Sequence, residues 1–352
     1  MDQEHHHRTP PGARQGQCSQ YRPRPVIDWQ QREKSIRTAV IGAGSFGKNH
    51  VRVVSENPRA QLTHVIDADL ERAREHAAPR GAVASADYRD IIGHADAAIL
   101  AVPTIAHAEI GCALLEAGLD VLIEKPIAPT LAEADRLVET AERYNRILQV
   151  GHLERFNPAI LALEKLATLP LFFEVHRMSV FTLRSLDVDV VLDLMIHDLD
   201  IVLAFARAPL KEIRAAGISI LSPKVDIANV RLEFEDGCIA NLTASRVSTD
   251  KVRKLRLFQP RQYISVDYAK QAAAAFTVGG PQGISFEQLP IETGEPLKLQ
   301  FDAFVDSVAS RAKPKLDGPA ARKTLEIALA VLAKIEEHAG IVTQTIASGW
   351  KP

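Results

Sequence analysis

The stretch "IRTAVIGAGSFGKNHVRVVSEN", residues 36–57, decides the fold of the first half of the chain. Its opening "IRTAVI" is largely apolar and predicts a short strand with both faces covered, and "SFGKNHVRVVSEN" follows a helical pattern. Gly42, Gly44 and Gly47 therefore lie in a strand-to-helix turn. In this spacing the first glycine makes a tight turn, the second lets the backbone approach a pyrophosphate, and the third lets helix and strand pack closely. The helix N-terminus then faces the phosphates, which predicts a dinucleotide site.

The alternation of strand and helix continues outward to residue 150. The apolar runs "AQLTHVIDA", "AAILAV", "DVLIEKP" and "RILQVGH" alternate with amphipathic segments. In one of these, "TLAEADRLVETAERYN", Thr130 is the expected helix cap and Glu133 stands three residues later. Apolar runs separated by helices are typical of parallel strands covered on both faces. Residues 36–150 are therefore predicted to form a doubly wound α/β domain with a parallel sheet.

The pattern changes after residue 150. Residues 153–169 and 187–207 have a helical pattern, whereas 211–278 contain several strand-like runs joined by short turns, one of them the hairpin signal "EDG". Residues 151–345 are therefore predicted to form an α+β domain for substrate binding and oligomerisation, with a large open mixed or antiparallel sheet. Residues 1–35 are rich in Pro, Arg, Gln and His without an apolar period, and we expect a disordered extension. A misassigned start codon, which mass spectrometry would test, is the alternative.

Composition limits the class of protein. With 352 residues, 46% of them hydrophobic and 24% charged, the chain is expected to form about two ordinary globular domains. A net charge of −2 argues against nucleic-acid binding. Cys18, Cys112 and Cys238 are scattered, which favours a reducing cytoplasm over a disulfide framework. There is no signal peptide and no apolar run of the ~18 residues that a membrane span needs, so we expect a cytoplasmic protein without membrane contact.

Polar residues stand at the ends of two predicted strands. Asp67 ends the second strand, where a carboxylate accepts hydrogen bonds from the adenosine ribose. Because Ala68 follows and no arginine stands beside it to receive a 2′-phosphate, NAD is favoured, with NADP as the alternative. Glu124 and Lys125 end a later strand, at the edge where open α/β sheets bind ligands. A lone lysine at a strand end is ordinarily a solvated surface charge, so the role of Lys125 depends on the other motifs in the chain.

The apolar stretch "DLMIHDLDIVL", residues 193–203, carries a carboxylate and an imidazole at helical spacing. Asp193 and His197 would share one face of a helix, and a carboxylate that orients an imidazole is a common general base. A structural pair is the alternative. A metal site that adds His176 fits by ligand type, but we expect no metal because a nicotinamide accepts a hydride without one. Asp200 is expected to bond nearby backbone or to meet solvent.

Together these motifs resemble the Gfo/Idh/MocA oxidoreductase family over residues 36–340. The resemblance rests on the glycine loop at 42–47, "AVPTIAH" at 101–107, "EKP" at 124–126 and Asp193-x-x-x-His197. It implies an NAD-dependent oxidoreductase acting on CH–OH groups, in which a Rossmann domain precedes the α+β domain. It also implies that Lys125, Asp193 and His197 are catalytic. His197 would take the proton from a hydroxyl, Asp193 would hold the imidazole, and Lys125 would hydrogen-bond the reacting oxygen.

The resemblance also implies cofactor contacts and an assembly. "VPT" at 102–104 departs from the Thr-Pro-Asn of many members, which bears on one cofactor contact and leaves the catalytic residues intact. Sheets of the second domain commonly pair between subunits in this family, which implies a homodimer or homotetramer. The residues expected at the cofactor are Gly42, Gly44, Ser45, Phe46, Gly47, Asp67, Pro103, Thr104, His107, Glu124 and Lys125.

The stretch "VGHLERFNPAI" at 150–160, with "SRVS" at 245–248 and "YISVDYAKQ" at 263–271, resembles one subfamily. Its members oxidise the 3-hydroxyl of UDP-N-acetylglucosamine to a ketone, which a separate aminotransferase converts into an amine for lipid A variants. The substrate contacts expected from this resemblance are His152, Glu154, Arg155, Asn157 and Arg246. A strand-end packing role is the alternative for His152.

Basic residues between 251 and 256 could clamp the pyrophosphate of such a substrate. Along a strand, Lys254 and Arg256 share one face, as do Lys251 and Arg253. A solvated basic strand edge is the alternative for this cluster. Two alternatives for function also stay open, a dehydrogenase of a free polyol such as inositol and a cofactor-binding regulator without turnover.

Overall fold

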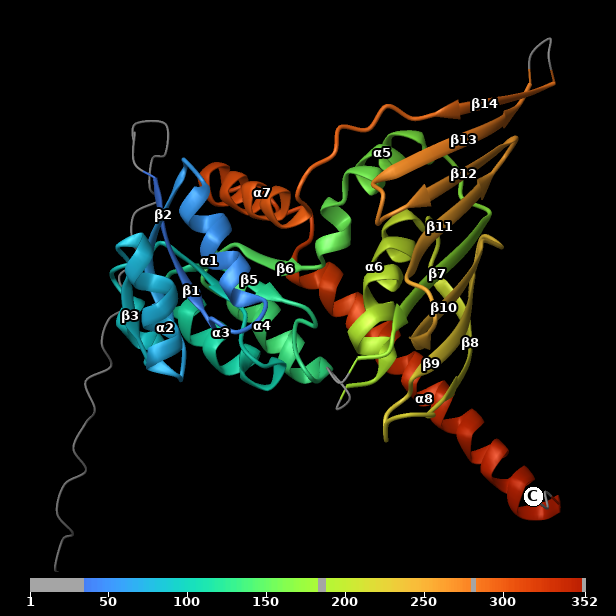
Figure 1. Cartoon of the computed structure of the whole chain (residues 1–352), viewed down its shortest axis with the longest axis horizontal. Helices are drawn as coiled ribbons and strands as arrows, with labels where there is room; N and C mark the ends of the chain where they lie inside the picture. The colour runs from blue at the N-terminus through green and yellow to red at the C-terminus, as the bar shows by residue number, and fades with distance from the viewer. Residues whose placement is uncertain (1–34, 183–187, 280–282, 350–352) are drawn as a thin grey trace, which may run out of the picture. The chain divides into compact units, whose positions relative to one another are not determined.

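Strands β1 to β6 form a parallel six-stranded sheet in the order β3-β2-β1-β4-β5-β6 (Figure 1). The computed structural model describes residues 35–182, 188–279 and 283–349, so the predicted extension at 1–35 lies, apart from Ser35, outside the described residues. Because the strand order reverses beside β1, the connections that follow β1 and β4 lead away from each other, and such sheets bind ligands in the crevice between these connections. The strands are β1 (Ile36–Ile41), β2 (Ala60–Ile66), β3 (Val83–Ser85), β4 (Ala97–Leu100), β5 (Asp120–Glu124) and β6 (Leu148–Gly151).

Helices connect these strands as the apolar pattern predicts. At α4 the Thr130 hydroxyl accepts a hydrogen bond from the backbone N–H of Glu133 at 3.3 Å, which confirms the predicted cap. The doubly wound domain is therefore confirmed. Its helices are α1 (Gly47–Glu56), α2 (Leu70–Ala77), α3 (His107–Glu116) and α4 (Leu131–Arg143), with short 3₁₀ turns at Ala78–Arg80, Tyr88–Ile91 and Thr104–Ala106.

A second, eight-stranded sheet has the order β14-β13-β12-β11-β7-β10-β9-β8. All its pairs are antiparallel except β7 with β10, and β9 and β10 form the hairpin that "EDG" predicts. This confirms the predicted mixed sheet. Its strands are β7 (Phe172–Val180), β8 (Leu210–Ile218), β9 (Ile227–Phe234), β10 (Ile239–Ser248), β11 (Val252–Gln259), β12 (Gln262–Asp267), β13 (Ala272–Val278) and β14 (Ile284–Gln288).

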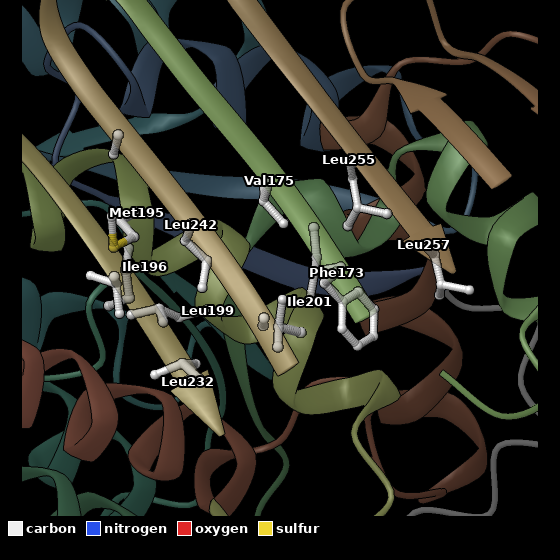
Figure 2. Packing of buried hydrophobic residues seen from close by; sticks show 14 of the residues in the cluster. Phe173, Val175, Met195, Ile196, Leu199, Ile201, Leu232, Leu242, Leu255 and Leu257 are labelled. Atoms are coloured by element: carbon white, nitrogen blue, oxygen red, sulfur yellow. The ribbon is translucent and has the colours of Figure 1, made fainter. Parts of the chain in front are cut away.

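One face of this sheet is covered by helices, and strand alternation decides which side chains reach it. Figure 2 shows Phe173 and Val175 of β7, Leu255 and Leu257 of β11, and Leu199 among the side chains that pack together there. The intervening residues point to the other, open face. The covering helices are α5 (Pro158–Leu166), α6 (Ile196–Phe205) and part of α8 (Gly318–Gly349), with a 3₁₀ turn at Leu153–Phe156 and a π-helical turn at Val191–Met195.

The last part of the chain returns to the first sheet. Helix α7 (Pro296–Ser310) packs on α1, and α8 packs on α4 as well as on β8. Leu316, Ala321 and Leu325 belong to the hydrophobic core of the first sheet. The Gln149 side chain also donates a hydrogen bond to the carbonyl of Gln300 at 3.0 Å. The predicted boundary near residue 150 therefore does not separate all later residues from the first domain.

No helix in the described ranges is both long and apolar enough to cross a membrane.

Candidate active site

The glycine loop has the geometry that its spacing predicts. Gly42 has φ +90°, and a Cβ there would lie 2.4 Å from the carbonyl oxygen of Ala101. A Cβ on Gly47 would lie 1.8 Å from the carbonyl oxygen of Gly42, so the loop closes tightly on the start of α1. Around Gly44, by contrast, no heavy atom of the described residues lies within 4 Å of such a Cβ. The open space at Gly44 fits the approach of a pyrophosphate to the backbone. Ser45 and Phe46 are exposed in the same loop.

Asp67 connects this loop to the end of β2. Its carboxylate accepts hydrogen bonds from the backbone N–H groups of Ala43 at 2.8 Å and Asp69 at 2.9 Å. Arg72, in the first turns of α2, lies 3.3 Å from the same carboxylate. The sequence argument that no arginine stands beside Asp67 is therefore wrong in space, because the turn before α2 brings Arg72 back. Contact of the Asp67 carboxylate with the adenosine ribose stays a prediction.

Glu124 and Lys125 end β5 as predicted, and each has a partner from a distant part of the chain. The buried imidazole of His50, on α1, forms a hydrogen bond from Nε2 to Glu124 Oε1 at 2.7 Å. Lys125 Nζ donates to the backbone carbonyl of Asp193 at 2.6 Å, and it lies 3.5 Å from the Asp193 carboxylate. The Lys125–Pro126 peptide bond is cis.

Asp193 does not hold His197 in the structure. Its carboxylate pairs with Lys125, whereas Nδ1 of His197 is buried and has no hydrogen-bond partner in the described part of the chain. Because residues 191–195 form a π-helical turn, the α-helical spacing behind the prediction does not apply there. His197 instead contacts His152, with a ring-to-ring distance of 5.8 Å at 80°. Its Nε2 is left as the nitrogen that a substrate can reach.

Burial sets the charge of both predicted catalytic groups. It lowers the pKa of His197 well below 6.5, and the positive charges of Lys125 and Arg177 lower it further. The imidazole is therefore neutral near pH 7 and can accept a proton. Burial also lowers the pKa of Lys125 from 10.5, while the nearby charges of Asp193 and Glu124 partly offset this effect.

A buried ionic network lies behind His197. Arg177, on the inner face of β7, donates to both carboxylate oxygens of Asp198, from Nε at 2.7 Å and from Nη2 at 2.8 Å. It also donates from Nη1 to Glu154 at 2.9 Å, and its guanidinium lies 5.3 Å from the ring centre of Tyr268. Arg253, from the inner face of β11, lies 3.6 Å from Glu154 and remains one-third exposed. Arg253 thus has the freest guanidinium of this network.

Three of the predicted substrate contacts have hydrogen-bond partners within the protein. Asn157 caps α5 by accepting from the N–H of Ala159, and its amide donates to Glu154 and to the carbonyl of Tyr268. Glu154 is thus bonded to Asn157 and Arg177 and is only 7% exposed. Arg246 donates to the carbonyls of Val188 and Val225 and pairs with buried Asp226 at 3.4 Å. Asn157, Glu154 and Arg246 are thus buried and bonded within the protein, and their contact with a substrate stays a prediction.

His152 and Arg155 need separate descriptions. His152 is 1% exposed, and neither ring nitrogen has a hydrogen-bond partner in the described ranges. It stays a predicted substrate contact beside His197. Arg155 lies 3.5 Å from Asp200 and 3.9 Å from Glu164, so much of its charge is neutralised. Asp200 is 2% exposed and also accepts from the Thr324 hydroxyl, which corrects the expectation of backbone or solvent contacts.

In the predicted cofactor loop after β4, His107 also has a structural role. Its ring nitrogens lie 3.0 Å from the carbonyls of Val102 and Pro126, and it is 1% exposed. It therefore joins two loops, and its contact with the cofactor stays a prediction. Pro103 is exposed and Thr104 half-buried at the same loop, so both remain predicted contacts.

Strand alternation divides the basic cluster between two faces of the second sheet. Arg253 is on the inner face, whereas Lys254 and Arg256 are exposed on the open face, where Arg256 pairs with Glu174 at 2.9 Å. His176 also faces the open side, near Glu174, which removes it from any site with His197. Among the described residues no group of three or more His, Cys, Asp or Glu side chains could hold a metal ion.

Sequence reasoning missed His50, Arg177 and the distinct position of Arg253. The signal for Arg177 was present, because it alternates with the buried Phe173 and Val175 along β7. For His50 there was no comparable signal in the sequence, since its partner Glu124 lies on β5, which is 74 residues further along the chain.

Two family models match the chain. The first, described as "Oxidoreductase family, NAD-binding Rossmann fold", matches residues 36–152, and the second, the "GFO/IDH/MocA C-terminal domain", matches residues 173–264. The chain is 34% identical over 307 residues to a UDP-N-acetylglucosamine 3-dehydrogenase of Acidithiobacillus ferrooxidans, a match that covers 86% of this chain and 97% of the relative. It is 30% identical over 225 residues to an inositol 2-dehydrogenase of Corynebacterium glutamicum, which covers 59% and 66%.

Solved structures give the same result. A structure of the Acidithiobacillus ferrooxidans UDP-N-acetylglucosamine 3-dehydrogenase matches with a TM-score of 0.82 and 32% identity, over 86% of this chain and 98% of that one. An oxidoreductase of Agrobacterium radiobacter in complex with NAD⁺, L-tartaric acid and magnesium matches with a TM-score of 0.76 and 18% identity, over 86% and 97%. The second likeness shows a shared fold.

Proposed function

Because the chain belongs to the Gfo/Idh/MocA family of NAD-dependent oxidoreductases, we propose that it oxidises the sugar 3-hydroxyl of UDP-N-acetylglucosamine to a ketone. The observation that carries this proposal is the 34% identity along 97% of a dehydrogenase of that substrate. The chain is an oxidoreductase that acts on CH–OH groups and uses NAD. The sugar nucleotide, its position of oxidation and the residues that act on it are what we propose.

Lys125 and His197 carry the proposed reaction. When bound, NAD supplies the acceptor for the hydride that leaves the sugar carbon. Neutral His197 accepts the proton of the 3-hydroxyl at Nε2, because Nδ1 is buried. The ammonium of Lys125 donates a hydrogen bond to the same oxygen and stabilises the negative charge that develops there.

We assign Asp193 to Lys125 and not to His197. The Asp193 carbonyl and carboxylate both lie within reach of Lys125 Nζ, at 2.6 and 3.5 Å. The negative charge of the carboxylate favours the charged form of the lysine and so opposes the effect of burial. The carbonyl accepts a hydrogen bond from Nζ and so orients the ammonium group toward the substrate oxygen. Asp193 is therefore a positioning residue, with the proton transfer left to His197.

Arg253 is the group that we propose for the pyrophosphate of the substrate. It lies on the inner face of β11, pairs loosely with Glu154 and keeps a third of its side chain exposed. A guanidinium in that state can add a bidentate contact to phosphate oxygens. Arg177 is less suited, since it is only 3% exposed and three of its five N–H groups already donate to Asp198 and Glu154.

The ketone is the form that an aminotransferase can consume, and we propose that the product feeds such an enzyme toward a 2,3-diamino sugar for lipid A. Oxidation of a secondary alcohol by NAD is thermodynamically uphill, so removal of the ketone would draw the reaction forward. Mass action suffices for this coupling, without a stable complex.

The open face of the second sheet supports assembly with another copy of the chain. A row of aromatic side chains crosses five neighbouring strands there, with ring distances between 4.9 and 5.7 Å. Monomeric proteins rarely expose a continuous apolar patch of this kind. We propose a homodimer or homotetramer in which two such faces pair. The row consists of Phe172, Phe258, Tyr263, Phe276 and Phe286.

The test is NADH formation followed by absorbance, with UDP-N-acetylglucosamine and NAD in the presence of glutamate and an aminotransferase specific for 3-keto sugar nucleotides. Lys125→Ala and His197→Ala should each reduce kcat by at least ~10²-fold. Arg253→Ala should raise KM for the nucleotide sugar by ~10-fold or more, with Lys254→Ala, on the open face, as the matched control.

Two other outcomes would identify other functions. Activity on inositol but not on the nucleotide sugar would support the dehydrogenase class of the Corynebacterium relative. Tight NAD binding without turnover of any substrate tested would indicate a regulator.

A further inference from the structure

We propose that His50 and Gly151 jointly fix the carboxylate of Glu124 for contact with the nicotinamide ribose of NAD. His50 does so by a hydrogen bond. Gly151 does so because it has no side chain, so the carboxylate can occupy the space beside it. The cofactor is NAD, and the site is the carboxyl end of β5. The proposal rests on the proposed function, which puts the nicotinamide end of NAD beside Lys125. Both residues would then be positioning residues.

The hydrogen bond comes from a fully buried side chain. His50 lies on α1, the helix that the glycine loop opens, and its Nε2 is 2.7 Å from Glu124 Oε1. Its ring also meets Phe46 of that loop edge-on, at 5.3 Å. Helix α1 therefore contacts the end of β5 while its N-terminus faces the predicted pyrophosphate position. A buried imidazole in this position permits little freedom to the carboxylate it holds.

The second restraint comes from the neighbouring strand. Gly151 pairs with Glu124 across β5 and β6. A Cβ on Gly151 would lie 2.7 Å from Glu124 Oε1, 2.8 Å from Cδ and 2.9 Å from Oε2. Such distances are too short for any real contact, so another residue at 151 would displace the carboxylate. The Glu124 side chain thus lies over β6 at a position where any residue other than glycine would collide with it.

The remaining oxygen of Glu124 indicates a ligand. Oε1 is bonded to His50, but Oε2 has no hydrogen-bond partner among the described residues, although the side chain is only 13% exposed. Glu124 directly precedes Lys125, and its charge raises the pKa of that lysine, so the two side chains lie near each other at the end of β5. A ribose hydroxyl is a donor that suits a carboxylate oxygen held in this way.

The experiment measures affinity and not turnover. Isothermal titration calorimetry gives the Kd of NAD and of ADP for the full chain and its variants, because ADP lacks the nicotinamide ribose. His50→Leu and Gly151→Ala should each weaken NAD binding by about tenfold and change ADP binding by less than about twofold. His50→Gln, which keeps a donor near the Nε2 position, should restore NAD affinity to within about threefold.

Val54→Ala is the matched control, since it removes buried volume from the same helix and leaves the His50–Glu124 hydrogen bond in place. It should lower the melting temperature and leave both Kd values unchanged. Equal weakening of NAD and ADP in the His50 and Gly151 variants would overturn the proposal, as would a lower melting temperature with unchanged NAD affinity. A lack of activity on UDP-N-acetylglucosamine would refute the proposed substrate and leave this binding result intact.

Discussion

Asp193 shows how a single local irregularity changes the role of a residue. Its spacing from His197 predicts one helix face, but the π-helical turn at 191–195 has more residues per turn than an α-helix. The Asp193 side chain is therefore rotated toward Lys125. Single π-helical turns are frequent at functional sites, and here one brings a backbone carbonyl and a carboxylate to the same lysine.

The pH dependence of activity separates the two roles of Asp193. Oxidation needs neutral His197 and charged Lys125, so kcat/KM should follow a bell whose acid limb lies below pH 6.5, because the pKa of His197 is lowered. The alkaline limb should lie below pH 10.5, because burial lowers the pKa of Lys125. Asp193→Asn removes a charge that raises the pKa of Lys125, and so the alkaline limb should move to lower pH.

Lys125→Met is the reference for this profile, since it should lack the alkaline limb altogether. If Asp193→Asn instead shifts the acid limb and leaves the alkaline one in place, Asp193 acts on His197 and our assignment is wrong.

We expect Asp67 and Arg72 to determine which cofactor the loop accepts. In the structure Arg72 is paired with Asp67 and Asp69. In Asp67→Ser the carboxylate that repels a 2′-phosphate is gone and the guanidinium is partly released, so kcat/KM for NADP relative to NAD should rise by ~10-fold or more. Steady-state kinetics with both cofactors measure this ratio. Adding Arg72→Ala should cancel the gain in NADP use, and a gain that survives would show that Arg72 has no part in it.

At the scale of elements, the Arg177–Asp198 pair connects β7 to α6. Both side chains are 3% exposed, and two short hydrogen bonds join them. Arg177→Met would leave a buried carboxylate without its partner, which should lower the free energy of unfolding by about 3–5 kcal/mol. The double variant Arg177→Met with Asp198→Leu removes both charges and should be more stable than the single variant. Urea unfolding measures both, and equal losses would contradict this explanation.

Strand alternation explains which parts of the site the sequence could predict. Residues at the carboxyl ends of β1, β2 and β5 were predicted in place, because apolar runs locate strand ends and parallel strands end at one edge. The hydrogen-bond partners of Asn157 and Arg246 were not predicted, because the partner of a polar side chain depends on neighbours far away in sequence. Tyr268 for Asn157 and Asp226 for Arg246 are such neighbours. Without the register of β7 and β11, Arg177 and Arg253 could not be assigned to the inner face.

At the scale of the whole molecule, the aromatic row makes a prediction about assembly. Phe276→Asp places a charge in the middle of the row, where its burial against a second copy would be unfavourable. Light scattering coupled to size exclusion should then show a smaller species than the parent chain. Val83→Asp, at the exposed edge of the first sheet, is the control and should leave the mass unchanged. An unchanged mass for both variants would place the interface elsewhere.

The return of α7 and α8 to the first sheet has a consequence for the order in which the protein is made. Leu316, Ala321 and Leu325 complete the hydrophobic core of the nucleotide-binding sheet, yet a ribosome translates them only after strands β1 to β14 of the described residues. A nascent chain that has emerged as far as β6 still lacks these side chains, and its apolar surface beside α4 stays open to water. The N-terminal half therefore cannot complete its core until the chain is nearly finished, although its sequence emerges first, and chaperones have that interval in which to bind it.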